Sequence, residues 1–327
     1  MTEKTTTYRQ LWLPTTKKEI ERLGWDYIDV ILFTGDAYID HPSMGCAVIG
    51  RVLESKGYRV AIIPQPNWQD DFRDFKKLGA PRLFFGISAG AMDSMVNHYT
   101  AARRKRSDDA YTPNGRAGAR PDYPTIVYSQ ILKKLFPEVP VIVGGIEASL
   151  RRLSHYDYWQ DKLRPSILFD AHADLLVYGM GEKAIVEITR QLETGKKVNE
   201  LTDIPQTAII TNAAEAAQAA GTDIVLHSFE ECLSDKKKQA ENFKHIEIES
   251  NRWEGHRLWQ VHGKKAIKVN PMYPPMTTEE IDASFDLPYT RLPHPRYNGK
   301  HMSTRRRCST SSTNTSRGWR SWAFRPS

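Results

Sequence analysis

Residues 139–159 have the sequence VPVIVGGIEASLRRLSHYDYW, and this stretch decides the fold class. An apolar run rich in β-branched residues ends at Gly144 and Gly145, and a helix-like segment follows. Polar and aromatic residues then come together, namely His155, Tyr156, Asp157 and Tyr158. A buried strand that ends in glycines at the start of a helix is where open α/β sheets bind their ligands. The stretch therefore predicts an α/β sheet and indicates where a binding site would lie.

The same alternation of strand and helix extends over residues 27–195. Apolar segments with turn signals predict five strands, at 27–33, 58–63, 82–85, 139–143 and 173–178. Strands that alternate with helices in this way predict a parallel sheet with helices on both faces, so we expect a Rossmann-like, three-layer α/β/α fold. Outside this region, Thr16 with Glu19 and Thr277 with Glu280 have capping-box spacing, which predicts two further helix starts.

The periodic signal weakens after about residue 205, which predicts a domain boundary there. Residues 1–205 would form the Rossmann-like domain, and residues 206–302 a smaller α+β extension and connector. Residues 303–327 contain eleven Ser or Thr, six Arg and no acidic residue. Such a segment cannot bury enough apolar surface to offset its ordering entropy, so we expect a disordered basic tail. We favour the out-of-frame end of a truncated chain over a tail that binds RNA.

The formal charge of +7 arises in this C-terminal segment. Without its six arginines the chain has 40 basic and 39 acidic side chains, and this balance argues against nucleic-acid binding by the main body. No apolar run approaches the roughly 20 residues that span a membrane. The N-terminus also lacks the charged start and apolar stretch of a secretion signal. We therefore expect a cytoplasmic protein with no membrane partner.

The three cysteines, Cys46, Cys232 and Cys308, lie far apart, with neither CxxC nor CxxxC spacing. This excludes a recognisable zinc or iron–sulfur motif within the chain. The odd number of cysteines and the expected cytoplasmic setting also argue against a disulfide framework. We therefore predict buried or incidental thiols, and no metal site or cofactor in the chain as it stands.

The loop after the first predicted strand, TGDAYIDHPS (34–43), is the first candidate site. It brings Asp36, Asp40, His41 and Ser43 to the carboxyl edge of the predicted sheet. One interpretation is a ligand-binding loop in which the start of the next helix holds an anion. The other is a structural turn in which Asp40 or Ser43 caps that helix.

The glycine-rich end of the strand at 139–143 is the second candidate site. Gly144 and Gly145 would let the backbone approach a ligand closely, with Glu147 near the helix start. Alternatively, these glycines only permit tight packing of strand and helix. Residues 155–157 would form either a binding site or a polar cluster that anchors a loop.

Two more strand ends carry candidate residues. Gly179, Gly181 and Glu182 repeat the arrangement after the last predicted strand, although Glu182 could simply cap its helix and favour the helix dipole. Ser88 lies in GISAG (86–90), which has the G-x-S-x-G spacing of a hydrolase nucleophile. The sequence shows no acid and base in the chain order that such an enzyme needs. The same segment lacks the lysine of a nucleotide-binding Walker motif.

Several of these segments are long and unusual, and they occur in a fixed order. TGDAYIDHPS (34–43), DDAYTP (108–113), GGIEASLRRLSHYDYW (144–159) and YGMGE (178–182) together resemble the N-terminal region of the YgiQ-type radical-SAM proteins. The likeness covers roughly residues 10–300. Near its end, LPYTRLPHPRY (287–297) resembles the segment that precedes the catalytic domain of that family.

The resemblance implies a cobalamin-binding-like α/β domain that leads into a radical-SAM barrel, which would be its partner domain. In that barrel a CxxxCxxC motif ligates a 4Fe–4S cluster. The remaining iron of the cluster binds S-adenosylmethionine, and reductive cleavage gives a 5′-deoxyadenosyl radical. The resemblance implies no particular substrate.

The sequence departs from the family pattern after Lys300, where it becomes rich in Ser, Thr and Arg and carries only Cys308. We therefore expect a truncated protein that neither holds a cluster nor cleaves S-adenosylmethionine by itself. The D-x-H-x-x-G pattern that ligates cobalamin is absent, because residues 40–45 have a different spacing. Two other classes of function stay open: a non-catalytic module that binds a ligand or partner, and a hydrolase based on Ser88.

Overall fold

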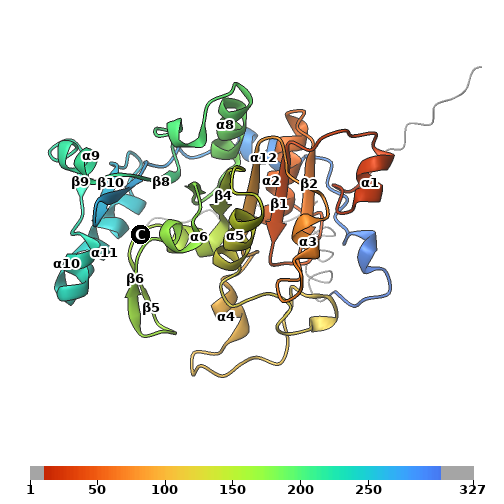
Figure 1. The fold of residues 1–327 in the computed structure, drawn as a ribbon, viewed down its shortest axis with the longest axis horizontal. Helices are drawn as coiled ribbons and strands as arrows, with labels where there is room; N and C mark the ends of the chain where they lie inside the picture. The colour runs from red at the N-terminus through yellow and green to blue at the C-terminus, as the bar shows by residue number, and fades with distance from the viewer. Residues whose placement is uncertain (1–10, 303–327) are drawn as a thin grey trace, which may run out of the picture.

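The computed structural model describes residues 11–302, so the predicted tail at 303–327 lies outside the described part. Within this part, one nine-stranded sheet has the order β2-β1-β3-β4-β7-β8-β11-β10-β9 (Figure 1). Its parallel strands are β2 (Val60–Pro64), β1 (Val30–Thr34), β3 (Phe84–Ser88), β4 (Val141–Gly144) and β7 (Leu175–Val177). The predicted α/β fold with a parallel sheet is therefore confirmed.

The sheet continues beyond β7 through four more strands. These are β8 (Thr207–Asn212), β11 (Lys265–Val269), β10 (Leu258–His262) and β9 (Ile224–Val225). The first three run antiparallel to the preceding neighbour, whereas β9 is parallel to β10. Strands on both sides of residue 205 thus belong to one sheet. The division of the chain into 1–205 and 206–302 stays a prediction.

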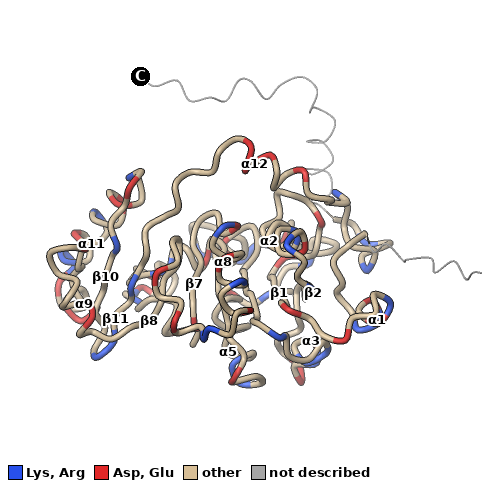
Figure 2. Tube along the Cα trace, turned by 90° about the horizontal axis from the view of Figure 1, so that it is seen from above, with Lys and Arg blue, Asp and Glu red and all other residues tan. Residues whose placement is uncertain are grey.

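Helices cover the parallel strands on both faces (Figure 2). On one face α2 (Gly45–Ser55) packs against α8 (Glu182–Glu193), and on the other α5 (Pro124–Leu135) packs against α3 (Arg73–Lys76) and α7 (Ile167–Ala171). Because successive side chains of a strand point to opposite faces, β1 contributes to two separate cores. Ile31 and Phe33 belong to the core beneath α5, and Leu32 belongs to the core beneath α2 and α8.

The remaining elements surround this three-layer core. Both predicted capping boxes are confirmed, at Thr16 before α1 (Lys17–Arg22) and at Thr277 before α12 (Thr278–Phe285). The other helices are α4 (Ser94–His98), α6 (Gly145–Leu150), α9 (Ala213–Gln218), α10 (Phe229–Ser234) and α11 (Lys236–Ser250). A separate hairpin consists of β5 (His155–Asp157) and β6 (Lys162–Arg164), and short 3-10 turns lie at Pro113–Gly115, Val198–Glu200 and Pro295–Tyr297.

Three elements differ from those predicted. The sequence pattern predicts a helix over 148–153, whereas α6 already begins at Gly145. The charged residues 230–249 predict one helix, but the structure divides it into α10 and α11, because Asp235 has extended backbone and its side chain accepts a hydrogen bond from the amide of Lys237. The sequence analysis missed β10, which pairs with β11 across a tight turn at Gly263, where φ is +58°.

The connector that follows α12 returns to the carboxyl edge of β1. The amide of His294 donates to the carbonyl oxygen of Tyr38 at 3.1 Å. In the other direction, the amide of Tyr38 donates to the hydroxyl of Tyr297 at 3.1 Å. Residues more than 250 positions apart in sequence are therefore adjacent at this edge.

Candidate functional site

A cavity of about 320 Å³ lies at the carboxyl ends of β1, β3, β4 and β7, between the sheet and the helices α2 and α8. Phe33 and Ser88 line it from β1 and β3, which adjoin in the sheet although β2 separates them along the chain. Such a reversal of strand order is the position at which open α/β sheets bind ligands. The volume falls in the range of small-molecule sites, so this cavity is the candidate site.

Seven of the residues that the sequence analysis singled out line the cavity: Ser43, Ser88, Gly144, Gly145, Gly179, Gly181 and Glu182. They come from the loops or strand ends that follow β1, β3, β4 and β7. Parallel strands bring their carboxyl ends to one edge, and for this reason four separate segments meet there. Asp36, Asp40, His41, Glu147 and residues 155–157 do not line this cavity.

Gly145 shows why glycine is needed on this wall. Its φ is +78°, a conformation that other residues adopt only with strain. A Cβ atom at this position would also lie 2.5 Å from Oγ of Ser88. Both facts agree with the interpretation that the glycines of this motif allow close packing. The cavity lies beside these glycines.

The walls of the cavity are largely apolar. Leu32, Ile49, Ile142 and Val177 are among the side chains that line it. Within the described part of the chain, Glu182 is the one charged side chain on the wall. The helices α2 and α8 both begin at the cavity without a side-chain cap, so their first-turn amides supply hydrogen-bond donors at its rim. The site therefore combines an apolar interior with backbone donors at one end.

Ser88 lacks the surroundings of a hydrolase nucleophile. Its hydroxyl accepts a hydrogen bond from the amide of Gly90 at 3.2 Å. No histidine of residues 11–302 lines the cavity. His155 lies outside the cavity, with its Nδ1 3.2 Å from the carbonyl oxygen of Leu153. A serine hydrolase needs a base within hydrogen-bond reach, so the structure does not support this class of function.

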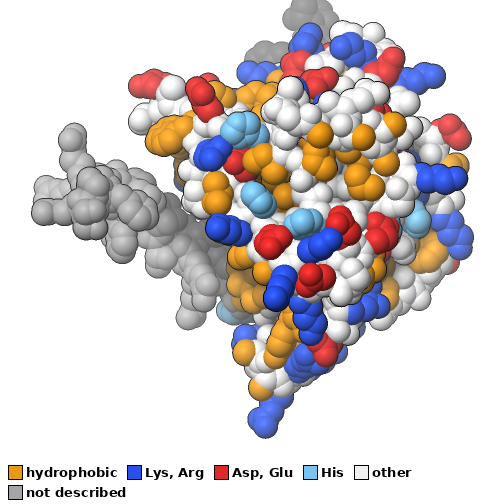
Figure 3. Space-filling view, turned by 90° about the vertical axis from the view of Figure 1, so that its left-hand side faces the viewer, with side chains coloured by type: hydrophobic (Ala, Val, Ile, Leu, Met, Phe, Trp, Pro, Cys, Tyr) orange, Lys and Arg blue, Asp and Glu red, His pale blue; other side chains and the backbone are white. Residues whose placement is uncertain are grey.

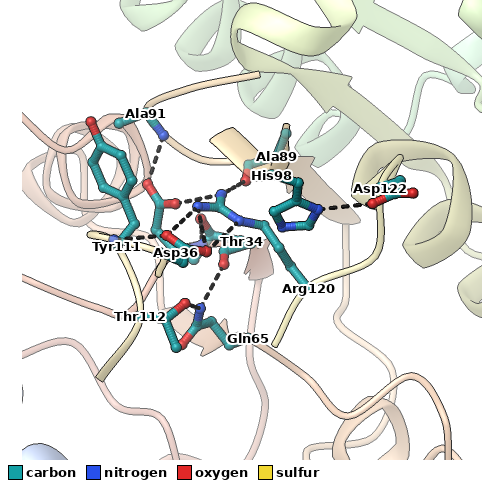
Figure 4. Close-up of polar contacts among 12 residues, drawn as sticks. Thr34, Asp36, Gln65, Ala89, Ala91, His98, Tyr111, Thr112, Arg120 and Asp122 are labelled. Carbon is teal, nitrogen blue, oxygen red and sulfur yellow. Dashed lines mark hydrogen bonds and ion pairs between the residues drawn. The ribbon is translucent and has the colours of Figure 1, made fainter. Parts of the chain in front are cut away.

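Asp36 belongs to a buried ionic network next to the cavity (Figure 4). Arg120 donates from Nη1 to Oδ1 of Asp36 at 2.7 Å and from Nη2 to the carboxylate of Asp109 at 3.1 Å. It also donates to the carbonyl oxygen of Ala89 at 2.9 Å, and the amide of Ala91 donates to Asp36 at 2.6 Å. Burial raises the pKa of Asp36 to about 6, although Arg120 opposes this shift. The network joins three loops at the carboxyl edge.

Asp40 and His41 likewise have structural partners. Asp40 is fully buried and accepts two hydrogen bonds from Arg51 of α2, at 3.0 and 2.5 Å, so it forms a bidentate pair. It also accepts a hydrogen bond from the amide of Thr290 in the connector at 2.8 Å. Nδ1 of His41 lies 2.8 Å from the hydroxyl of Ser43, and burial lowers the pKa of this histidine. These contacts give Asp40 and His41 structural partners, but the predicted cap is wrong: the N-cap of α2 is Met44, and no side chain caps the helix.

Glu147 is buried on α6 without a hydrogen-bond partner for either carboxyl oxygen among the described residues. Burial raises the pKa of this carboxyl to about 8, and the charge of Arg151 opposes the shift only in part. Arg151 itself forms an ion pair with Asp93 at the start of α4. Glu147 is therefore expected to be mostly protonated near neutral pH.

Residues 155–157 form β5 of the separate hairpin and lie outside the cavity. Asp157 accepts hydrogen bonds from the hydroxyl of Tyr123 at 2.8 Å and from the amide of Trp159 at 2.8 Å. Burial lowers the pKa of His155 to about 4, so it is neutral at physiological pH. Tyr156 is 56% exposed. Of the two interpretations, the loop-anchoring cluster describes Asp157 well, whereas Tyr156 points into solvent.

A comparison with known protein families identifies the chain. A family model described as "Radical SAM N-terminal" matches residues 12–311. The chain belongs to this family. The UPF0313 proteins of Bacteroides thetaiotaomicron and Porphyromonas gingivalis are 64% and 65% identical to it over 302 and 292 residues. Each of these alignments covers 89% of the chain, and the resemblance seen in the sequence is confirmed.

This radical-SAM N-terminal chain spans about half the length of the curated relatives it matches. The alignments cover 48% and 46% of the two relatives above, and 45% of a UPF0313 protein of Rhodopseudomonas palustris that is 49% identical. Family membership therefore implies a companion radical-SAM domain in these longer proteins. None of the helices between residues 11 and 302 has the length and apolar character needed to cross a bilayer.

Residues 11–302 of this radical-SAM N-terminal chain do not fit an iron–sulfur cluster. Such clusters are held by thiolates, and Cys46 and Cys232 are far apart in sequence, on α2 and α10. Burial raises the pKa of Cys232 to about 11 and that of Cys46 further, which disfavours the thiolate form. In residues 11–302 no group of three or more His, Cys, Asp or Glu side chains could hold a metal ion. No reaction step through a cluster is assigned to this chain.

Proposed function

We propose that this chain is a ligand-binding module that serves the radical-SAM chemistry of a longer protein. In this proposal the cavity at the carboxyl edge of the sheet holds a small, mainly apolar ligand. The companion domain supplies the 4Fe–4S cluster and S-adenosylmethionine, and the module by itself is not an enzyme. Two observations support the proposal. Family membership supports the companion radical-SAM domain, and the cavity supports the binding of a ligand by this chain.

The choice of ligand rests on the types of residue that line the cavity. Neither Lys nor Arg is among the described wall residues, so a phosphate would be held here by backbone amides alone, next to the carboxyl group of Glu182. Apolar side chains such as Ile142 and Val177 suit an uncharged ring or chain. Glu182 has a buried oxygen, Oε2, without a partner in the described part of the chain, and this atom could accept a hydrogen bond from an N–H or O–H group of the ligand.

An exposed apolar rim supports a docking site for the companion domain beside the cavity. Met92, just before α4, is 36% exposed, and Val96 on α4 is 59% exposed. On α6, Ile146 and Leu150 are 41% and 61% exposed. Met180, which also lines the cavity, is 56% exposed. Exposed apolar side chains that gather at one place are typical of protein–protein contact sites.

Direct contacts show that the segments of this apolar rim adjoin. The ion pair of Arg151 and Asp93 joins the end of α6 to the start of α4. The hydroxyl of Ser149 accepts a hydrogen bond from the amide of Gly179 at 3.2 Å, which joins α6 to the loop after β7. The relatives contain about as much chain again, so a domain of the right size exists to cover the rim. We therefore place the radical-SAM domain over this edge of the sheet.

A neutral fluorophore, N-phenyl-1-naphthylamine, tests the cavity. Gly45 lines the cavity at an exposed position, and a Cβ atom there would meet nothing within 4 Å, so Gly45→Leu adds a large side chain at the cavity opening with no clash at Cβ. We expect the wild type to bind the fluorophore and Gly45→Leu to lose most of this binding. Ser55→Leu adds the same side chain at the exposed far end of α2 and should bind as the wild type does. Equal binding by all three proteins would contradict the proposed site.

Anaerobic reconstitution with iron and sulfide tests the division of labour. The isolated chain should retain less than one iron and should not cleave S-adenosylmethionine. About four irons per chain, with charge-transfer absorption near 400 nm, would refute this part of the proposal. The two tests fail separately, because the fluorophore reports on the cavity and the iron content on the cluster.

Limited proteolysis of the full-length Bacteroides thetaiotaomicron relative tests the docking site. Glutamate at the positions aligned with Ile146 and Leu150 should speed cleavage between the two halves, because a charged rim would no longer bind the companion domain. Glutamate at the position aligned with Leu233, which is 56% exposed on α10, is the matched control and should have no effect. Cleavage at the wild-type rate in the rim variant would contradict this docking site.

A further inference from the structure

The even charge balance of the main body conceals a local concentration of basic side chains. Arg103, Arg104, Lys105 and Arg106 are consecutive and all exposed. Hydrogen bonds within the backbone hold this basic turn in shape: the amide of Arg103 donates to Thr100 at 2.9 Å, and the amide of Arg106 to His98 at 2.7 Å. No ion pair joins any of the four cations to a residue of the described chain. The basic turn is thus ordered, and none of its four side chains is held in a salt bridge within residues 11–302.

Exposed aromatic rings lie next to the basic turn although they come from another element. The hairpin β5–β6, which projects from the body in Figure 1, exposes Tyr156 on β5 and Tyr158 in its turn by 56% and 57%. Lys162 on β6 adds a further exposed cation. Figure 3 shows several Lys or Arg side chains beside hydrophobic ones at the lower end of the molecule.

Specific contacts fix the basic turn to the hairpin. Nη2 of Arg103 donates to the carbonyl oxygen of Tyr158 at 2.6 Å, and its guanidinium lies 4.6 Å from the centre of the Tyr158 ring. The hydroxyl of Tyr158 donates to the carbonyl oxygen of Ala101 at 3.2 Å. The rings of Tyr99 and Trp159 are in contact, with their centres 4.1 Å apart and their planes tilted by 32°. The cations and the rings therefore form one preorganised surface.

Three of the acidic side chains near this surface have hydrogen-bond partners of their own. Asp161 accepts a hydrogen bond from the hydroxyl of Tyr156. Asp122 lies 2.9 Å from Nδ1 of His98 (Figure 4), and it also accepts a hydrogen bond from the hydroxyl of Tyr99 at 2.9 Å. Asp157 is buried and accepts the hydrogen bonds described above. Asp122, through its interaction with Lys105, and exposed Asp108 offset the cations only in part, so the surface presents positive charge to an anionic partner.

We propose that the basic turn 103–106 and the tyrosines 156 and 158 form a binding surface for single-stranded nucleic acid. The phosphates of the strand would contact Arg104, Lys105 and Arg106, and unpaired bases would stack on the two exposed rings. Base stacking on aromatic side chains next to a basic groove is how proteins bind single strands without reading their sequence. A duplex keeps its bases stacked on each other, so the rings would contribute nothing to its binding.

Fluorescence anisotropy with a labelled 12-nucleotide strand tests this surface on the full chain. Removing one cation that binds a phosphate lowers the slope of log K against log salt by about 0.7 for a single strand, so Arg104→Gln/Lys105→Gln/Arg106→Gln should lower it by about 2. Tyr156→Ala and Tyr158→Ala should each weaken binding about 5- to 150-fold, the range expected for one stacked base, and leave the slope unchanged. Tyr156→Phe and Tyr158→Phe keep the ring and should bind nearly as the wild type does.

Matched controls separate this surface from general attraction to a basic protein. Lys236→Gln/Lys237→Gln/Lys244→Gln removes three exposed cations of α11 and should leave affinity and salt slope unchanged. All variants keep residues 303–327, so the arginines there contribute equally to each measurement. RNA and DNA strands are compared directly, and preference for either supports the proposal. Equal losses in the two triple variants, no loss in the alanine variants, or equally tight binding of a duplex would overturn it.

Discussion

The buried carboxyl group of Glu147 should make the stability of the protein depend on pH. It is almost fully buried, and neither carboxyl oxygen has a hydrogen-bond partner within the described chain. Burial raises its pKa from an ordinary 4.5 to about 8. Between these two values the folded protein keeps a proton that the unfolded chain has released. Unfolding therefore releases a proton in this window, and rising pH favours the unfolded state.

The size of the effect follows from this shift. Stability contributed by protonated Glu147 is fully present below pH 4.5 and is lost as the pH rises through about 8. One pKa unit corresponds to about 1.4 kcal/mol, so between pH 5 and pH 8 this group should cost the wild type about 3 kcal/mol. Glu147→Gln keeps the shape of the protonated side chain and cannot ionise. Its stability should exceed that of the wild type at pH 8 and be similar at pH 5.

Urea unfolding at pH 5, 6.5 and 8, followed by circular dichroism, measures the free energy of unfolding of both proteins. Other titrating groups are common to both and cancel in the difference. Glu21→Gln, an exposed glutamate on α1, is the control and should follow the wild type at every pH. A constant difference between wild type and Glu147→Gln across the three pH values would refute the reasoning, because it would mean that Glu147 titrates alike in both states.

Three other substitutions have expected outcomes measurable by chemical unfolding. Asp40→Asn removes the buried counter-charge of Arg51 and should lower the free energy of unfolding by about 3–5 kcal/mol; a loss below about 1 kcal/mol would show that the pair is solvated. Gly145→Ala forces a side chain into a φ of +78° and should cost about 1–3 kcal/mol, whereas Gly45→Ala, with no atom within 4 Å of the new Cβ, should be neutral or stabilising. Thr16→Ala removes the cap of α1 and should cost about 1 kcal/mol, while Thr16→Ser should keep most of the stability.

The sequence predicted the parallel strands well because their signals are local. An apolar segment such as Val141–Val143 ends at glycine and precedes a helix, and each of these features can be recognised within about ten residues. The glycines and Ser43 on the cavity wall could be predicted for the same reason. Parallel strands must bring their carboxyl ends together, so residues after separate strands were expected to meet at one edge.

The buried ionic pairs could not be predicted, because they join residues with no relation in sequence. Arg120 lies 84 residues from Asp36, in a segment whose Gly and Pro content predicts only irregular structure. Asp40 was a candidate ligand residue, yet its partner Arg51 lies well inside the following helix, 11 residues further along the chain. A carboxylate at a strand end has the same sequence signal whether it faces a ligand or a buried arginine. Only the tertiary position of the cation distinguishes them.

The motif at 139–159 shows that unusual residues close together in sequence need not form one site. Its residues are neighbours along the chain, but strand, helix and hairpin direct them to three places. Gly144 and Gly145 line the cavity, Glu147 is buried on the next turn of α6, and Tyr156 and Tyr158 are exposed on the hairpin beside the basic turn. Each place imposes its own chemistry: space for a ligand, a proton held by burial, and rings open to solvent. A cluster of unusual residues in one segment therefore indicates several separate constraints, and a single active site is only one arrangement that would produce it.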